Sequence, residues 1–119
     1  MKHASAEVLA NIKTSITATT RALAQNHAIS ISFGESLRGA TIELPRLTEV
    51  PGPEALHSLR AQADAGAAAV RYHRADIHQQ HRPAHGMNGS LFDMLEQVRL
   101  EARLSEHRLG VEHNFISHY

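Results

Sequence analysis

The segment 91–104, LFDMLEQVRLEARL, constrains the fold more than any other part of this chain. Its apolar residues recur at the i, i+4, i+7 and i+11 spacing of one helical face, which predicts an amphipathic helix. These residues are Leu91, Leu95, Val98 and Ala102, and Met94 widens the stripe. We expect the stripe to pack in the core, with a solvated charged face opposite it. Gly86 and Gly89 predict a loop just before this helix, which extends to about residue 107.

Two other segments, residues 4–25 and 54–73, also have the apolar period of helices. In the second of them, residues 61–69 are nearly all small, and Gly66 lies among them. A glycine inside a helix costs about 1 kcal/mol relative to alanine, which usually indicates a packing reason. We expect another backbone to approach this helix closely, with the 91–104 helix as the candidate.

The segment between these two helices changes period. Residues 28–33 and 40–44 alternate apolar and polar side chains around a turn bounded by Gly34 and Gly39. Two such runs predict an antiparallel β-hairpin, which must pack on a helix to be stable. The expected fold class is therefore α+β: three main helices packed with a short antiparallel β-hairpin, in a single domain spanning residues 1–119. The tail after Gly110 is too short to classify.

The composition limits the classes of partner. Twelve basic and twelve acidic side chains cancel, and a balanced chain has no broad attraction for nucleic acid or an anionic membrane. No apolar run approaches the roughly 18 residues of a membrane-spanning helix. The chain has no cysteine, which excludes disulfides and thiolate metal sites and suits the cytoplasm. We therefore expect a cytoplasmic protein with no nucleic-acid or membrane partner, and leave its oligomeric state open.

Histidine is unusually frequent, with ten in the chain. Four of them crowd into the polar segment 73–85, where a short helix at 76–82 would place His78 and His81 on one face. Zinc or cobalt accepts imidazole ligands at such a spacing. The candidate metal ligands are His73, His78, His81 and Glu96. The simpler interpretation is a solvated surface segment without a metal.

Other catalytic chemistry finds no support. The sequence has no cysteine nucleophile and no G-x-S-x-G elbow. Its glycines form neither a Walker loop nor a dinucleotide-binding loop. We therefore assign no catalytic and no cofactor-binding residue.

Several stretches together resemble the N-terminal region of the T subunit of aerobic cobaltochelatase, a complex of cobalamin biosynthesis. The resemblance covers roughly Leu9 to Gly110. It is carried by TTRALA at 19–24, ISFG at 31–34, ADAG at 63–66, RYH at 71–73, His78 and residues 92–102. Family members have in addition a long acidic middle segment and a C-terminal von Willebrand A-type domain, which are absent here. The resemblance implies either an excised N-terminal domain or a short stand-alone relative.

The same resemblance implies a role in ATP-dependent insertion of cobalt into hydrogenobyrinic acid a,c-diamide. In that complex an AAA+ ATPase subunit assembles with the T subunit, and a large subunit holds the tetrapyrrole. The chain would then be a non-catalytic assembly and interaction domain with no cofactor of its own. ATP and Mg²⁺ are used by the complex, and cobalt is its substrate.

A more distant similarity links the order hairpin, helix, loop, helix to zincin-type peptidases. The best register places residues 65–69, AGAAA, at the H-E-x-x-H motif, so both histidines and the glutamate are missing. This similarity implies a degenerate zincin-like scaffold. With those ligands missing, we expect Glu96 to be a polar residue near the small-residue helix that pairs with Arg99 or Arg71. The alternative functions are a zincin-like metal-dependent hydrolase that uses Glu96 with histidines from 73–85, or an unrelated helical interaction module.

Overall fold

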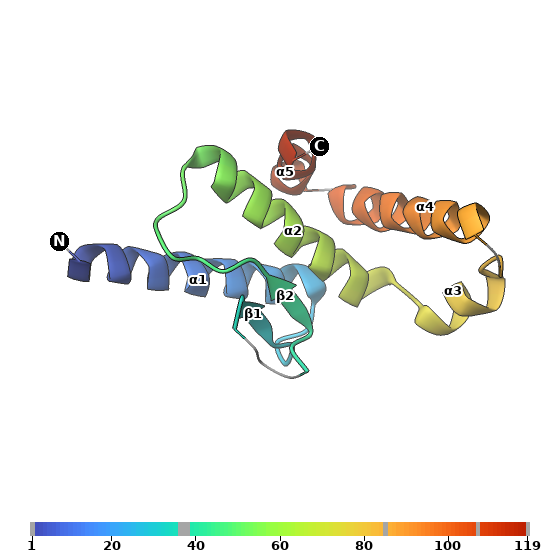
Figure 1. Cartoon of the computed structure of the whole chain (residues 1–119), viewed down its shortest axis with the longest axis horizontal. Helices are drawn as coiled ribbons and strands as arrows, with labels where there is room; N and C mark the ends of the chain where they lie inside the picture. The colour runs from blue at the N-terminus through green and yellow to red at the C-terminus, as the bar shows by residue number, and fades with distance from the viewer. Residues whose placement is uncertain (1, 36–38, 85, 107, 119) are drawn as a thin grey trace.

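The computed structural model describes residues 2–35, 39–84, 86–106 and 108–118. These residues form five helices and a two-stranded sheet in an elongated molecule of 53 × 32 × 27 Å (Figure 1). In chain order the elements are α1 (Lys2–Ala24), β1 (Ile31–Phe33), β2 (Ile42–Leu44), α2 (Pro53–Tyr72), α3 (Ala75–His81), α4 (Gly86–Ser105) and α5 (Leu109–His118).

The element at the centre of the fold is α2, not the 91–104 helix (Figure 1). One side of α2 packs on α1 and the sheet through Leu59, Ala63 and Ala67. The other side packs on α4 and α5 through Ala61 and Ala68. Because alanine side chains are short, they let neighbouring elements approach α2 from both sides. The run of small residues thus meets α4 as predicted, but it serves the opposite layer as well.

Gly66 was expected to face the 91–104 helix, but it faces the sheet. A Cβ atom added at Gly66 would lie 2.9 Å from Cγ2 of Ile42 on β2. The packing reason predicted for this glycine is therefore present, with a different neighbour.

The prediction of an antiparallel hairpin is wrong, because β1 and β2 run parallel, with Ile31 opposite Ile42 and Phe33 opposite Leu44. Side chains alternate with a period of two in either direction, so the alternation could not distinguish the two pairings. Each strand has only three residues and spans about 10 Å. The connecting segment 34–41 is long enough to return over that distance. Phe33, Ile42 and Leu44 are buried against the helices.

The face of α4 predicted to be buried is exposed. Leu91, Leu95 and Val98 are each more than half exposed, whereas α4 buries Leu100 and Leu104. At about 100° per residue, Leu100 lies half a turn from Leu91. The helix packs mainly through its C-terminal half, on α2 and α5. It also begins at Gly86, so that the predicted loop around Gly86 and Gly89 forms its first turns.

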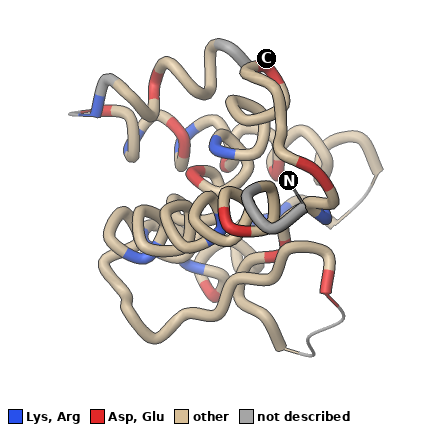
Figure 2. The backbone as a smooth tube through the Cα atoms, turned by 90° about the vertical axis from the view of Figure 1, so that its left-hand side faces the viewer, with Lys and Arg blue, Asp and Glu red and all other residues tan. Residues whose placement is uncertain are grey.

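The tail that could not be classified from sequence forms α5. Val111 and Phe115, one helical turn apart, bury against α2 and α4. The zincin-like scaffold is not confirmed: Ala65 and Ala69, at the positions of its zinc-binding histidines, pack on the same apolar cluster. No helix among the described residues is long and apolar enough to cross a bilayer. Acidic and basic positions are interspersed over the helices (Figure 2).

Candidate functional site

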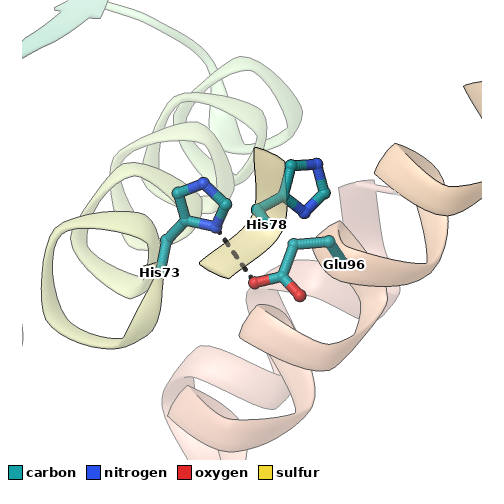
Figure 3. A group of neighbouring side chains, drawn as sticks. All are labelled: His73, His78 and Glu96. Carbon is teal, nitrogen blue, oxygen red and sulfur yellow. Dashed lines mark hydrogen bonds and ion pairs between the residues drawn. The ribbon is translucent and has the colours of Figure 1, made fainter. Parts of the chain in front are cut away.

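Three of the predicted metal-ligand residues meet where α2, α3 and α4 converge: His73, His78 and Glu96 (Figure 3). His73 ends α2, and its backbone N–H bonds the carbonyl oxygen of Ala69 at 3.0 Å. His78 lies on α3, and Glu96 projects from α4. One ligand atom from each residue lies within 4.8 Å of the other two. Nδ1 of His73 is 3.0 Å from Oε1 of Glu96.

The two imidazole rings are held by aromatic contacts. The ring of His78 packs on Phe92, with 4.8 Å between centroids, and it meets the ring of His73 in a T-shaped arrangement, with 5.1 Å between centroids. The side chains of the three clustered residues are between 12% and 28% exposed. The cluster is therefore partly shielded, yet open to solvent on one side.

Arg99 fixes the carboxylate of Glu96. Its Nε donates to Oε2 at 2.9 Å, and its Nη2 donates to Oε1 at 2.7 Å. The bonds from Arg99, with a smaller contribution from His73, lower the pKa of Glu96 to about 2 against the opposing effect of burial. Glu96 is therefore an anion at neutral pH, and its predicted pairing with Arg99 is confirmed.

Asp93 is a member of the site that the sequence pattern did not identify. Its Oδ1 accepts from Nε2 of His78 at 2.7 Å, and Arg82 donates to both carboxylate oxygens at 3.0–3.2 Å. These bonds, Arg82 first and His78 next, lower the pKa of Asp93 to about 2. Gly89 makes room for Arg82, because a Cβ there would lie 2.8 Å from the guanidinium. The sequence signal that could have identified Asp93 is its i, i+3 spacing from Glu96, which places both carboxylates on one side of the same helix.

A second feature is an exposed apolar stripe along α4. It consists of Met87, Leu91, Met94, Leu95 and Val98, whose exposed fractions run from 51% at Leu91 to 85% at Met87. Their i, i+4, i+7, i+8 and i+11 spacing places them on one helical face. Contiguous apolar surface of this kind commonly marks an interaction site. The stripe carries no reactive group.

A third feature is a groove of about 350 Å³ between α1 and α2, at whose wall Asp64 lies. Asp64 is only 4% exposed and accepts a hydrogen bond from Nδ2 of Asn114 on α5 at 3.0 Å. Burial raises the pKa of Asp64, while the bond from Asn114 and the charge of Arg60 oppose the rise. The bond from Asn114 joins this carboxyl group of α2 to α5, so we assign Asp64 to packing between helices.

Comparison with protein families adds evidence independent of this geometry. A family model described as cobalamin biosynthesis protein CobT matches residues 7–118, which is nearly the whole chain. The chain belongs to the CobT family. Comparisons with curated proteins and with solved structures gave no match. The resemblance found in the sequence is thereby confirmed, and the family places the chain in cobalamin biosynthesis.

In this CobT-family chain the four candidate ligands separate into two groups. His73, His78 and Glu96 are brought together, whereas His81 is not one of the three grouped residues. His81 instead lines an adjoining hollow of about 300 Å³, together with Phe92 and the clustered residues His78 and Glu96. Two imidazoles and one carboxylate can hold a cation or share protons.

Proposed function

We propose that this chain is a non-catalytic assembly domain of the T subunit of an ATP-dependent cobaltochelatase. The observation that carries the proposal is the CobT family match over residues 7–118. The complex would insert cobalt into hydrogenobyrinic acid a,c-diamide, with cobalt as its substrate and ATP and Mg²⁺ used by the ATPase partner. Residues 1–119 would act as one domain, through protein contacts.

The exposed stripe on α4 supports an assembly role. A leucine gains about 1.5–3 kcal/mol when it is fully transferred from water to an apolar environment. Leu91 and Leu95 are 51% and 59% exposed, so much of that gain is still available to a partner. Apolar residues at this spacing are the anchors by which a helix docks into a partner's groove.

The helix that presents the stripe is held at both ends. Leu100 and Leu104 anchor its C-terminal half in the core. Its N-terminal half is tied to the end of α3 by the Arg82–Asp93 ion pair. A rigid, preorganised apolar face loses little conformational entropy on binding. We assign the AAA+ ATPase subunit as the partner that docks on the stripe, and the large tetrapyrrole-binding subunit as the other member of the complex.

The test is capture of the purified AAA+ ATPase subunit by this chain, before and after the stripe is charged. The double variant Leu91→Lys, Leu95→Lys places two ammonium groups on the stripe. Because both positions are exposed, its free energy of unfolding should stay within about 0.5 kcal/mol of that of the unaltered chain. Its affinity for the ATPase subunit should fall roughly tenfold or more, since each buried leucine contributes on that scale.

The matched control is Val50→Lys, because Val50 is also an exposed apolar residue but lies in the loop before α2. This variant should bind the ATPase subunit as the unaltered chain does. If the unaltered chain does not bind the purified subunit, the proposed partner is wrong. If the double variant binds as tightly as the control, the stripe is not the contact surface.

A further inference from the structure

We propose that His73, His78 and Glu96 form a binding site for one late first-row divalent cation of the zinc and cobalt class. The inference rests on the cluster itself and does not depend on the role assigned to the chain in cobaltochelatase. The three ligands come from the end of α2, from α3 and from α4 (Figure 3).

The distances within the cluster are close to those that a cation requires. Zn²⁺ binds nitrogen and oxygen ligands at about 2.0–2.2 Å, which places two tetrahedral ligands roughly 3.4 Å apart. Nδ1 of His73 and Oε1 of Glu96 are already 3.0 Å apart, and no pair of ligand atoms exceeds 4.8 Å. Small side-chain rotations would therefore complete the set without movement of a helix. The ion would take the place of the hydrogen bond between Nδ1 of His73 and Oε1 of Glu96, with the hydrogen of the neutral imidazole on Nε2.

His78 has the supporting contact that metal-binding histidines generally have. A histidine ligand usually donates its second ring N–H to a carboxylate, which fixes both the tautomer and the ring orientation. Arg82 donates to both oxygens of Asp93, which marks this carboxylate as an acceptor, so Nε2 of His78 donates to it across 2.7 Å. Nδ1 of His78 is then left with its lone pair for the ion. The bidentate Arg82–Asp93 pair and the contact with Phe92 keep the ring in place.

Glu96 supplies the negative charge. Arg99 donates to both of its oxygens, with the longer bond of 2.9 Å at Oε2. In the bound state Arg99 would keep Oε2, and Oε1 would coordinate the ion as a single ligand atom. The guanidinium thus orients the carboxylate, and it also competes for Oε1, so we expect moderate affinity.

The ligand set decides the class of metal. Two imidazoles and one carboxylate suit Zn²⁺, Co²⁺ and similar ions, whereas Mg²⁺ and Ca²⁺ prefer sites made entirely of oxygen. Three protein ligands leave at least one coordination position for water or another molecule. The adjoining hollow of about 300 Å³, into which the cluster opens, has room for such a ligand.

The test is titration of the metal-free, tag-free chain with Co²⁺, followed by its visible d–d absorption. The unaltered chain should bind one Co²⁺ with the intense absorption of four- or five-coordinate cobalt, and Zn²⁺ should displace it. Glu96→Gln and His78→Ala should each weaken binding roughly 100-fold, and Asp93→Asn about 10–100-fold. The control is His27→Ala, which removes an exposed histidine from the loop after α1 and should bind like the unaltered chain.

Thermal unfolding gives a second readout that separates lost ligands from lost fold. Saturating Zn²⁺ should raise the unfolding temperature of the unaltered chain and of His27→Ala, since an ion that binds only the folded state stabilises it. It should leave Glu96→Gln unchanged, provided that this variant has the circular dichroism of the unaltered chain. Weak octahedral cobalt absorption in the unaltered chain, or equal affinity in folded Glu96→Gln and His27→Ala, would overturn the site.

Discussion

Replacement of Gly66 by alanine tests the packing between α2 and the sheet. Three atoms of Ile42 surround the place where the new Cβ would lie: Cγ2 at 2.9 Å, Cδ1 at 3.0 Å and Cγ1 at 3.1 Å. Favourable carbon–carbon contacts have separations of about 3.5–4.0 Å, so all three distances are repulsive. Ile42 is itself buried between α2 and the rest of its layer. It cannot simply rotate into solvent.

The sign of the effect follows from two opposing terms. Alanine is favoured over glycine inside a helix by about 1 kcal/mol. Overpacking a filled core typically costs about 1–3 kcal/mol. Because the clash involves three atoms of a buried side chain, we take the middle of that range and expect Gly66→Ala to destabilise the chain by about 1 kcal/mol. Gly110→Ala is the control, since Gly110 is exposed in α5 and has no atom within 4 Å of its added Cβ. It should be neutral or stabilising by up to about 1 kcal/mol.

The measurement is urea-induced unfolding followed by far-ultraviolet circular dichroism. Ile42→Ala removes all three clashing atoms, so in that background Gly66→Ala should no longer destabilise, and the double-mutant cycle should report the clash as a coupling energy. If Gly66→Ala instead stabilises the unaltered chain as much as Gly110→Ala does, the close approach of Ile42 to α2 is refuted.

Two further predictions, made with three substitutions, examine burial elsewhere in the fold. Because burial raises the pKa of Asp64 above its ordinary 3.8, the folded state holds this proton more tightly than the unfolded chain, so stability falls as the pH rises through the interval above 3.8. Asp64→Asn should remove that fall, so the free energy of unfolding of the variant should increase relative to that of the unaltered chain as the pH rises. Parallel curves of unfolding free energy against pH for the two proteins would contradict this. Leu104→Ala should lower the free energy of unfolding by about 2–5 kcal/mol because Leu104 is fully buried. Leu91→Ala should change it by less than about 0.5 kcal/mol. Equal losses of stability in urea unfolding of the two variants would contradict the observed orientation of α4.

The helices could be predicted because their apolar residues recur at the helical period. The expected segments 4–25, 54–73 and 76–82 match α1, α2 and α3 to within two residues. The period locates a stripe but does not say what covers it. On α4 the most regular stripe faces solvent, and the core is reached through the less conspicuous pair Leu100 and Leu104. The prediction failed for α4 because it assumes that the apolar face of a helix is buried, and this helix keeps its most regular apolar face exposed.

The sequence pattern could not predict the direction in which the two strands pair or which residues far apart in the chain come into contact. The alternation of β1 and β2 is the same in a parallel as in an antiparallel pair. Likewise, the small residues of α2 predicted close packing but not that Gly66 would meet Ile42. The α5 helix had one usable signal, the i, i+4 pair Val111 and Phe115, which is too short to separate a helix from a loop.

The sequence predicted that histidines and a carboxylate would form the candidate site, but it predicted only some of the residues that lie there. Histidine density and a carboxylate on the next helix identified His73, His78 and Glu96, which lie together. His81 was predicted because it shares a helical face with His78, but it lines the adjoining hollow and is not one of the three clustered residues. Asp93 was missed because its role depends on where Arg82 and His78 lie in space, which local spacing does not give.

The two features proposed to be functional lie on different sides of one helix. At about 100° per residue, Glu96 is 100–140° around α4 from Leu95 and Leu91, so a partner on the stripe leaves the cluster uncovered. The core anchors Leu100 and Leu104 lie in the C-terminal half of α4, whereas the stripe begins in its N-terminal half. That half is tied to the rest of the fold by the contact of Phe92 with His78 and by the Arg82–Asp93 ion pair, and the His73–Glu96 bond holds the middle of the helix. A cation at the cluster would join α2 and α3 to the middle of α4, and would thereby add to the contacts that hold the stripe in place for a partner.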